Sequence, residues 1–258
     1  MNVSDKKPFA QQTQEQLKDC RVSAWRRYAL LTVGRSRFGA LLLYELITGT
    51  LCNFPGMAGF WLRQKFYRYI VSSLGKGVII GRNVTIRGGA KIDIGDHVSI
   101  DDNVVIDARG ENGLVLIGSG ALISRNTILR ARNASLTVGE GSDVGANCIL
   151  ATDSNLEVGK DVLIAAYSYL CAGGNHAYDR TDIPMIRQGF VSRGGVVIED
   201  DVWIGSHAMI MDGVHIGKGS IIGVHSLVNK DIAEGSIAFG QPAVTRGNRM
   251  EGAGAGND

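Results

Sequence analysis

Aliphatic residues recur at every sixth position in the C-terminal part of the chain. The position four residues after each of them is mostly small or β-branched. The aliphatics are Ile198, Ile204, Ile210, Ile216, Ile222 and Val228. A period of six fits neither an α-helix nor a simple alternating strand. It predicts a short flat strand followed by a turn, with three such units making one triangular coil.

The same period continues upstream, in blocks whose register slips by a few residues from one block to the next. The blocks are Ile80, Ile86 and Ile92; Ile94, Ile100 and Ile106; Ile117, Ile123 and Leu129; Val138, Val144 and Leu150; and Val158, Ile164 and Leu170. The slips indicate short insertions at the corners. The pattern predicts a mainly β solenoid of about six to seven coils over residues 78–240, in which inward aliphatics stack on those of the next coil. A β-sandwich, with turns about every 8–12 residues, is the alternative.

Glycine is the unusual feature of the composition. The chain has 35 glycines among 258 residues but only four prolines, and it lacks the Gly-X-Y period of collagen. Glycine and asparagine supply the positive φ angles that tight corners need. Hydrophobic residues make up 45% and charged residues 20% of the chain, which excludes a disordered or polyelectrolyte protein.

The cysteines indicate a reducing compartment. Cys20, Cys52, Cys148 and Cys171 lie far apart without a CxxC pair, which argues against a disulfide-stapled secreted domain or a cysteine-rich zinc site. Met1–Ala10 is polar and lacks the apolar core of a signal peptide. We therefore expect a cytoplasmic protein.

Three regions depart from the repeat. Residues 173–197 interrupt it with a polar loop, and loops this long in compact domains are usually functional. Residues 1–77 precede it and are expected to be helical. Residues 241–258 follow it as a tail that we expect to be partly disordered.

The repeat and three further segments resemble the hexapeptide-repeat acyltransferases. The segments are CAGGNHAYDR from Cys171, DVWIGS from Asp201, and the closing turn Gly240–Ala243. The sequence is most similar to the sugar O-acetyltransferases that include maltose and galactoside acetyltransferases, closely over residues 138–243. Residues 1–77 look more like polysaccharide-modifying relatives. The resemblance implies a left-handed parallel β-helix that forms a homotrimer and uses acetyl-CoA. The left hand rests on the resemblance alone, because parallel crossovers are right-handed in nearly all proteins.

His176 is the expected general base. Acetyl transfer to a hydroxyl needs a base for its proton and donors for the oxyanion of the tetrahedral intermediate. Of the five histidines, only His176 lies in the interrupting loop, just past a Gly-Gly pair. It also matches the catalytic histidine of the family. The alternative is an exposed loop histidine with no task.

Three polar residues are candidates for the acceptor side of the site. Asp153 lies one coil before the loop and matches an acidic position that contacts acceptor in the sugar enzymes, where a carboxylate would also fix the tautomer of the base. Asn147 matches a nearby position, and Asp179 is a rival within the loop itself. Alternatively, corner Asp and Asn residues only cap turns through their own backbone.

Three other histidines raise the question of a metal. His207 and His225 are eighteen residues apart and should stack on one corner of adjacent coils. With His215 they suggest zinc, as in the β-helical carbonic anhydrases, but the spacing does not resemble the ligand pattern of those enzymes. We expect no metal.

The resemblance also implies an acetyl-CoA groove between neighbouring coils of two subunits. It puts Trp203, Gly205 and Ser206 near the pantetheine and thioester, with a backbone N–H around Ser206 as the oxyanion donor. Alternatively, Trp203 only covers the edge of the coil. The later positions of the groove match Gly223, Val224, Asn229 and Lys230.

The phosphate contacts of acetyl-CoA are less well matched. Lys230 corresponds to a position at the nucleotide phosphates. The basic residues that follow the G-x-P turn in the family are displaced here, because Val244 and Thr245 occupy that stretch. Arg246 and then Arg249 come after them and are the remaining candidates.

The N-terminal region is basic and apolar. Residues 1–76 hold 12 Lys/Arg against 4 Asp/Glu, whereas the rest of the chain holds 15 against 21. Between Arg37 and Arg63 lie 25 residues with one charge, Glu45. This length would cross a bilayer, but Asn53–Gly56 should break the helix, and the positive-inside bias opposes a span.

Two short apolar helices joined at Pro55 fit these residues better. Arg35, Arg37, Arg63, Lys65 and Arg68 would then lie together at the open end of a hairpin that dips into one leaflet, or of an in-plane anchor. Either arrangement gives a peripheral contact with the cytoplasmic membrane face through residues 36–70. The alternative is a helical cap on the solenoid end or between trimer subunits.

The sequence thus predicts an enzyme that moves acetyl from acetyl-CoA to a hydroxyl of a sugar or of a surface-polysaccharide precursor, free or lipid-linked. Its expected partners include no nucleic acid. A second possibility is N-acetylation of an amino sugar nucleotide or an antibiotic. A third is a non-catalytic β-helix scaffold, against which the histidine loop and the DVWIGS segment argue.

Overall fold

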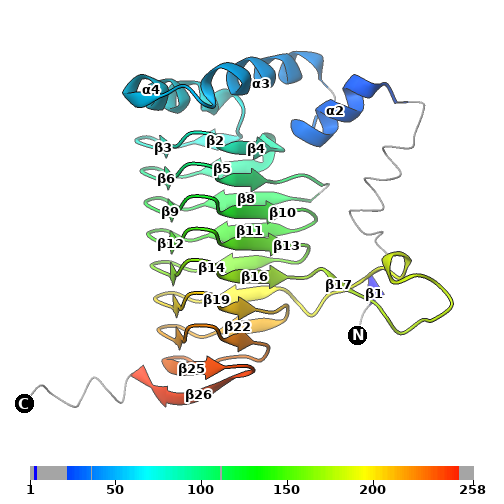
Figure 1. Ribbon diagram of the computed structural model, residues 1–258, viewed down its shortest axis with the longest axis vertical. Coiled ribbons are helices and arrows are strands. Elements are labelled where there is room, and N and C mark those ends of the chain that lie inside the picture. The colour runs from blue at the N-terminus through cyan, green and yellow to red at the C-terminus, as the bar shows by residue number, and fades with distance from the viewer. Residues whose placement is uncertain (1–2, 5–21, 36, 111, 250–258) are drawn as a thin grey trace, which may run out of the picture.

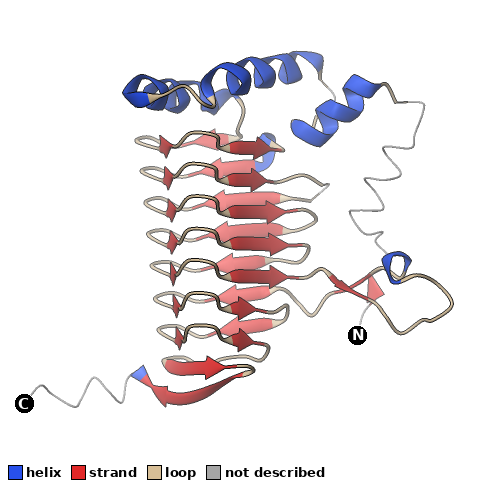
Figure 2. Cartoon of the chain, viewed as in Figure 1, coloured by secondary structure: helices blue, strands red, loops and turns tan. Residues whose placement is uncertain are grey.

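The repeats form a three-sided parallel β-helix with helices across its first end (Figures 1 and 2). The computed structural model describes residues 3–4, 22–35, 37–110 and 112–249. Within the coils, neighbouring strands of each face pair in parallel. The expected solenoid is therefore confirmed, and the β-sandwich alternative is wrong.

Each coil contributes one strand to each of three sheets, which we call sheets I, II and III in chain order. Coils are numbered from the N-terminal end: coil 1 begins with β2, coil 7 ends with β24, and β25 starts the next coil. Sheet I contains β2 (Ser73–Leu74), β5 (Ile92–Ile94), β8 (Leu114–Ile117), β11 (Ser135–Val138), β14 (Leu156–Val158), β19 (Val196–Ile198) and β22 (Val214–Ile216). Sheet II contains β3 (Ile79–Ile80), β6 (Ser99–Ile100), β9 (Leu122–Ile123), β12 (Asp143–Val144), β15 (Leu163–Ile164), β20 (Trp203–Ile204), β23 (Ile221–Ile222), β25 (Ser236–Gly240) and β26 (Ala243–Asn248). Sheet III contains β4 (Thr85–Arg87), β7 (Val105–Asp107), β10 (Ile128–Ala131), β13 (Ile149–Thr152), β16 (Tyr169–Ala172), β21 (Met209–Ile210) and β24 (Leu227–Val228).

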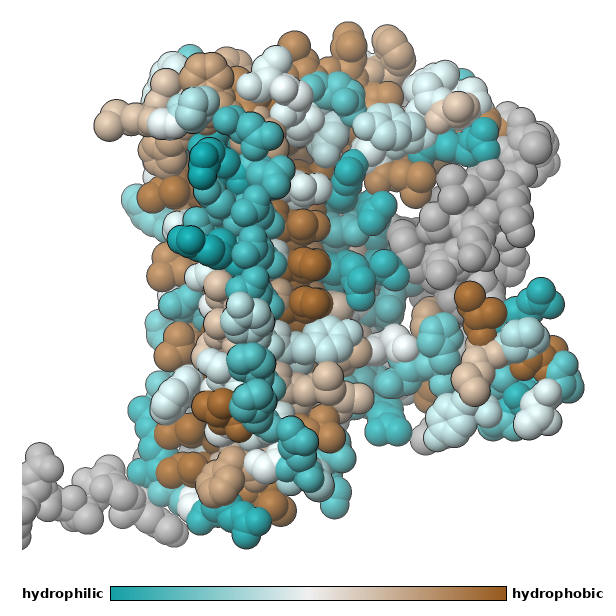
Figure 3. Space-filling model, viewed as in Figure 1, coloured by the Kyte–Doolittle hydropathy of each residue, from teal (hydrophilic) through white to brown (hydrophobic). Residues whose placement is uncertain are grey.

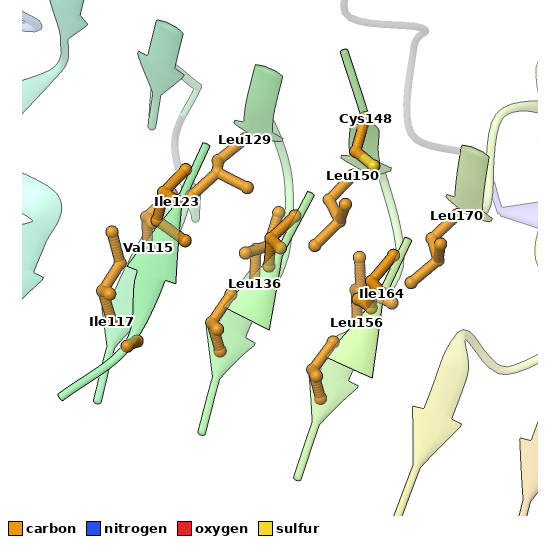
Figure 4. Packing of buried hydrophobic residues seen from close by; sticks show 14 of the residues in the cluster. Val115, Ile117, Ile123, Leu129, Leu136, Cys148, Leu150, Leu156, Ile164 and Leu170 are labelled. Atoms are coloured by element: carbon orange, nitrogen blue, oxygen red, sulfur yellow. The ribbon is translucent and has the colours of Figure 1, made fainter. Parts of the chain in front are cut away.

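The hexad aliphatics make the core, as the sequence predicted. All six from Ile198 to Val228 are at most 1% exposed. They stack in register along the axis: Leu129, for example, pairs with Ile106 of the preceding coil and Leu150 of the next. Figure 4 shows this inward packing in coils 3 to 5. Each fully buried aliphatic stabilises the fold by about 1.5–3 kcal/mol, so the repeat itself specifies the coil.

The corner between sheets II and III needs a left-handed residue in every coil. The seven residues there have φ between 56° and 64° and are Asn83, Asn103, Asn126, Asn147, Tyr167, His207 and His225. Asparagine is the expected occupant, and Asn126 Nδ2 donates to Asn147 Oδ1 across two coils at 3.1 Å. In coils 5 to 7 aromatic rings stack instead.

The corner between sheet III and the next sheet I takes the insertions that the register slips predicted. The longest lies between β16 and β19, where β17 (Asn175–His176) and β18 (Phe190–Val191) pair antiparallel. A short helix, η3 (Met185–Arg187), lies between them, and β1 (Val3–Ser4) adds a third strand. The interrupting loop is thus a hairpin that projects from the side of the solenoid (Figure 1).

The far end of the solenoid is closed by β26, which pairs antiparallel with β25. The tail expected over residues 241–258 therefore begins as a strand, and residues 250–258 lie outside the described residues. The solenoid also begins earlier than predicted, with β2 at Ser73–Leu74.

Three helices and a 3-10 turn cover the first coil: α2 (Ala24–Thr32), α3 (Phe38–Leu51), α4 (Gly56–Phe66) and η1 (Tyr67–Tyr69). Tyr44, Ile47 and Tyr67 are buried beneath them, and the Tyr44 hydroxyl donates to the Ile86 carbonyl at 2.9 Å. The helices are therefore a cap on the solenoid end. None of the helices in the described part of the chain is long and apolar enough to cross a membrane.

Arg63 lies elsewhere than the sequence predicted. Its side chain is buried and donates to the carbonyls of Ile80 at 2.9 Å, Leu51 at 3.2 Å and Phe54 at 2.8 Å. It thus ties the α3–α4 turn to coil 1 and does not join the exposed cations at the open end of a hairpin. Unpaired main-chain carbonyls at a buried helix end require such a donor.

Candidate active site

The hairpin that carries His176 leaves and rejoins the solenoid through glycine pairs. Gly173 and Gly174 have φ of 97° and 80°, and Gly194 and Gly195 have φ of 115° and 95°. A Cβ on Gly195 would lie 2.2 Å from the carbonyl oxygen of Asn155. Only glycine tolerates both this backbone conformation and this close approach.

A buried carboxylate fixes the base of the hairpin. Asp212, which follows β21, accepts hydrogen bonds from the backbone N–H of Gly195 at 2.9 Å and of Arg193 at 2.7 Å. It also accepts one from Asn175 Nδ2 at 3.1 Å. Because Asn175 directly precedes His176, these contacts position the imidazole relative to coil 6.

His176 lies at the edge of the hairpin and is exposed. It is paired with Phe190 in the strand register, and the two rings lie 4.6 Å apart between centroids. The aromatic contact limits the rotation of the imidazole while leaving part of it open to solvent.

Beneath His176 is a pocket of about 260 Å³ at the corner between sheets III and I. Its wall comes from residues that align across coils 3 to 5: Arg130 pairs with Ala151, and Ala151 with Cys171. Two positions farther along these segments come Arg132, Asp153 and Gly173. The pocket is lined by Arg130, Arg132, Asp153, Tyr169, Cys171 and His176, among others.

Asp153 is the acidic group of this pocket. Burial raises its pKa, and the nearby charges of Arg132, Arg130 and His176 act in the opposite direction. Its Oδ1 is buried and accepts no hydrogen bond from any described residue. Burial and the neighbouring Cys171 thiol raise the pKa of Tyr169 to about 12, so its hydroxyl stays protonated at neutral pH.

His176 also lines a second pocket, of about 510 Å³. Asp179, Tyr178 and Arg193 line it as well. Asp179 therefore shares a cavity with His176, as does Asp153, but the two carboxylates line different cavities. The sequence candidates Asp153, His176 and Asp179 are thus brought together.

Asn147 is separated from this group. It lies on the corner between sheets II and III, in the asparagine ladder described above, whereas Asp153 lies at the other end of β13. Its position agrees with the alternative that corner asparagines serve the turn.

The residues expected to bind acetyl-CoA form a second group. Trp203, Gly205, Ser206, Gly223 and Val224 lie at or beside the corner between sheets II and III in coils 6 and 7. Trp203 and Val224 are exposed. A Cβ on Gly205 would lie 2.7 Å from the backbone nitrogen of Val224, so the close approach of the coils requires glycine there.

The remaining candidates for the cofactor lie apart from this group. Asn229 and Lys230 are exposed in the turn that follows β24. Arg246 is in β26, with its guanidinium 6.0 Å from the centre of the Phe239 ring. Arg249 is ion-paired with Asp201 at 2.8 Å.

The three histidines considered for zinc do not converge. The ring of His207 stacks between those of Tyr167 and His225, with centroids 5.0 and 4.6 Å apart. His215 lies on sheet I, and its Nε2 is 3.0 Å from Glu199 Oε1. Throughout the described ranges, no three His, Cys, Asp or Glu side chains are grouped to hold a metal ion.

The sequence analysis did not single out Arg130, Arg132, Tyr169 or Cys171, which line this pocket. A usable signal exists, because each follows or precedes an inward hexad aliphatic by one or three positions. The segments Leu129–Arg132, Leu150–Asp153 and Leu170–Gly173 are equivalent in successive coils. Aligning them places Arg132, Asp153 and the hairpin exit at one corner.

Comparisons with known proteins agree with the fold and the repeat. The family model of the bacterial transferase hexapeptide (six repeats) matches residues 195–230. A probable acetyltransferase of Mycobacterium tuberculosis is 29% identical over 88% of this chain and 69% of its own length. The galactoside O-acetyltransferase of Lactococcus lactis is 33% identical over 42% of this chain, which spans half the length of that enzyme.

A solved structure extends the likeness to the whole fold. The crystal structure of the polySia specific acetyltransferase NeuO superimposes with a TM-score of 0.54 at 23% identity, over 69% of this chain and 86% of that one. The solenoid is thus the left-handed parallel β-helix that the resemblance implied. The repeat, the fold and the relatives thus confirm the resemblance of the chain to the hexapeptide-repeat acetyltransferases.

Proposed function

We propose that the chain transfers acetyl from acetyl-CoA to a sugar hydroxyl, with His176 as the general base. The observation that carries this proposal is that a histidine on a paired hairpin lines the same pocket as Asp153, one oxygen of which is buried. The lactococcal relative is a galactoside O-acetyltransferase, which supports an oxygen of a sugar as the acceptor. A non-catalytic β-helix scaffold would not require a histidine and a carboxylate in one pocket.

In this mechanism the imidazole of His176 takes the proton of the acceptor hydroxyl as the oxygen attacks the thioester carbonyl. The tetrahedral intermediate then collapses to the acetyl ester, and the departing CoA thiolate receives the proton from the imidazolium. Asp153 orients the imidazole and stabilises its protonated form. The lone pairs of Asp153 Oδ1 are available for this purpose, because no described residue donates to that atom.

Acetyl-CoA would lie along the second group, with Trp203 and Val224 against the pantetheine and a backbone N–H near Ser206 at the oxyanion. Lys230 and Arg246 are the candidates for its phosphates. The two groups occupy opposite ends of the sheet III strands, and a four-residue strand spans roughly 13 Å. A homotrimer, in which the second group of one copy faces the His176 hairpin of its neighbour, would join them.

The experiment is a transfer assay on the full-length protein with acetyl-CoA, reading free thiol and product mass. Galactosides, polysaccharide fragments, amino sugar nucleotides and chloramphenicol serve as acceptors, so that oxygen and nitrogen products are distinguished. His176→Ala should lower kcat roughly 10²–10⁴-fold. His215→Ala, which alters an exposed histidine on sheet I, is the matched control and should retain activity.

Loss of activity in both variants, or in neither, would refute the assignment of the base. A product acetylated only at nitrogen would replace the sugar hydroxyl with an amine as acceptor.

A peripheral contact with the cytoplasmic membrane face completes the proposal. It is supported by the outer surface of α3, where Phe38, Leu42 and Leu46 recur every fourth residue and are 60–62% exposed. Apolar side chains also gather on the helical end in Figure 3. An enzyme held there would meet lipid-linked acceptors at the membrane surface.

A further inference from the structure

We propose that the acceptor carries an anionic group, a carboxylate or a phosphate, which Arg130 and Arg132 bind next to the hydroxyl that is acetylated. This inference rests on the proposed function, because it interprets the pocket beneath His176 as the acceptor site. It adds a substrate class and two specificity residues to that function.

The first observation concerns the guanidinium of Arg130. It is partly buried in the pocket wall, yet its guanidinium makes no hydrogen bond or ion pair with any described residue. The neighbour of Arg130 in the preceding coil is Asp107, by strand register. Both oxygens of Asp107 are occupied by Arg109, at 2.8 Å from Nε and 2.7 Å from Nη2.

Two other arginines of the fold, in contrast, have acceptors within the protein. Arg109 has its carboxylate partner, and the buried Arg63 donates to three carbonyls. A guanidinium that is partly withdrawn from water is stabilised by an anionic acceptor. None of the described residues supplies one to Arg130, and the pocket is where a ligand can bring it.

The floor of the pocket leaves space for such a group. The residues that follow Arg130 along the sheet are Ala151 and Cys171, both small. Tyr169, two strand positions before the outward-facing Cys171, also lines the pocket, and its hydroxyl stays protonated. This gives a neutral donor beside the cationic wall.

The two arginines of the pocket repel each other. Arg130, Arg132 and Asp153 line the same pocket, and burial and the neighbouring charge of Arg130 lower the pKa of Arg132. An added anion would relieve the repulsion between the guanidinium groups.

Carboxylates and phosphates are the groups that match this wall. The planar fork of arginine binds both in bidentate fashion, with more specificity than a lysine would give. Because His176 lines the same pocket, the anion and the reacting hydroxyl must lie on the same sugar or on adjacent sugars. A uronic acid and a sugar phosphate supply the same chemistry from two sources.

The test is a binding measurement that needs no acetyl transfer. Glucose, glucuronate and glucose 1-phosphate are titrated into the full-length protein by ligand-observed NMR. We expect the anionic sugars to bind more tightly than glucose, with the better of the two identifying the source of the anion. Arg130→Gln should weaken binding of the preferred anion roughly 10- to 100-fold and leave glucose unchanged.

Two further variants make the result specific. Arg130→Lys keeps the charge but not the fork, so the preferred anion should bind it with intermediate affinity. Arg125→Gln removes an exposed arginine at the other end of the same coil segment, where it pairs with Asp101, and should bind like the wild type. In the transfer assay, Arg130→Gln should raise KM for an anionic acceptor with little change in kcat.

The proposal is overturned if the anionic sugars bind no better than glucose, or if their advantage survives in Arg130→Gln. Selective anion binding without acetyl transfer to any acceptor would instead contradict the proposed function and leave the anion site in place. Acetyl transfer to neutral sugars alone, with no preference for an anion, would contradict the anion site and leave the proposed function in place.

Discussion

Asp153 holds a negative charge where burial opposes it. One of its oxygens is buried and accepts no hydrogen bond from any described residue. Such a carboxylate lowers the stability of the fold relative to an amide of the same shape. The role that we propose for Asp153, orienting the imidazole of His176, would account for its presence, whereas the packing of coil 4 does not.

This gives a prediction about pH. Burial raises the pKa of Asp153 above its ordinary value of 3.8, so the native state binds this proton more tightly than the unfolded chain. The resulting contribution to the free energy of unfolding is complete below 3.8 and is lost as the pH rises through the native pKa. Compared with Asp153→Asn, the wild type should therefore become progressively less stable as the pH rises above 3.8.

Urea unfolding of both proteins at several pH values measures this difference. Glu157→Gln, which alters an exposed carboxylate on β14, is the control and should track the wild type. A difference between wild type and Asp153→Asn that grows in favour of the wild type with rising pH would contradict the burial effect.

Among the residues that line this pocket, the sequence analysis proposed Asp153 and His176 but not Arg130. His176 stands out because it lies in a long interruption of a strict repeat. Arg130 occupies an outward position of a strand, where arginine normally extends into water. Only the pairing of Asp107 with Arg109 in the neighbouring coil, and the small residues on its other side, make Arg130 unusual. These are contacts between coils that a single repeat does not contain.

Among the elements, the helices of the cap have two apolar faces. On α3, Leu41, Tyr44 and Ile47 are buried against coil 1, and Phe38, Leu42 and Leu46 are exposed. On α4, Trp61 is exposed and Lys65 lies over its ring at 5.0 Å. An aromatic residue with an adjacent cation is typical of a membrane interface. The sequence predicted two apolar helices but could not tell which face packs on the solenoid.

The cap region is also cationic. Over residues 22–76 of the described chain, Glu45 is the one carboxylate, and it accepts a hydrogen bond from the Tyr28 hydroxyl at 2.7 Å. Arg26, Arg37, Lys65 and Arg68 are exposed. An apolar face rimmed by cations is complementary to an anionic lipid surface.

We predict that the full-length protein sediments with vesicles containing phosphatidylglycerol and less with neutral vesicles. Replacing Leu42, Leu46 and Trp61 by glutamine should lower the vesicle affinity at least about tenfold, because three apolar side chains no longer leave water. The matched control is Val244→Gln, an exposed apolar residue at the other end of the solenoid.

Equal sedimentation of the triple variant and the wild type would refute the membrane contact. A change in oligomeric state in place of vesicle binding would show that this face contacts another copy.

For the whole molecule, the hexad predicted the fold because burial is decided locally. Each aliphatic stacks only on its equivalents in neighbouring coils, so six residues suffice to specify one side of the prism. The corners were predicted less well. Left-handed backbone at Tyr167, His207 and His225 is tolerated because their rings stack across coils, which glycine and asparagine cannot do. The closing strand β26 has no hexad and was not foreseen.

The proposed assembly follows from the placement of the two groups of site residues. The His176 hairpin and Asp153 lie at the corner between sheets III and I, whereas Trp203, Gly205 and Val224 lie at the corner between sheets II and III. Side chains at opposite ends of the sheet III strands are too far apart to act on the same bond. In the proposed trimer the second corner of one chain would lie beside the hairpin of the next, and cyclic symmetry would repeat this contact at every interface.

Mixing two inactive variants tests this arrangement directly. His176→Ala lacks the base, and Val224→Trp, at an exposed corner residue, should obstruct the acetyl-CoA groove without disturbing the core. If each site takes its base from one copy and its groove from the next, a random mixture of the two variants in equal amounts restores about a quarter of the wild-type activity, because about one site in four draws both intact parts. Refolding or co-expression produces the mixture, and each variant alone supplies the background. Sites contained within one chain would give no recovery at any ratio, which would refute the shared site even if the molecule were a trimer.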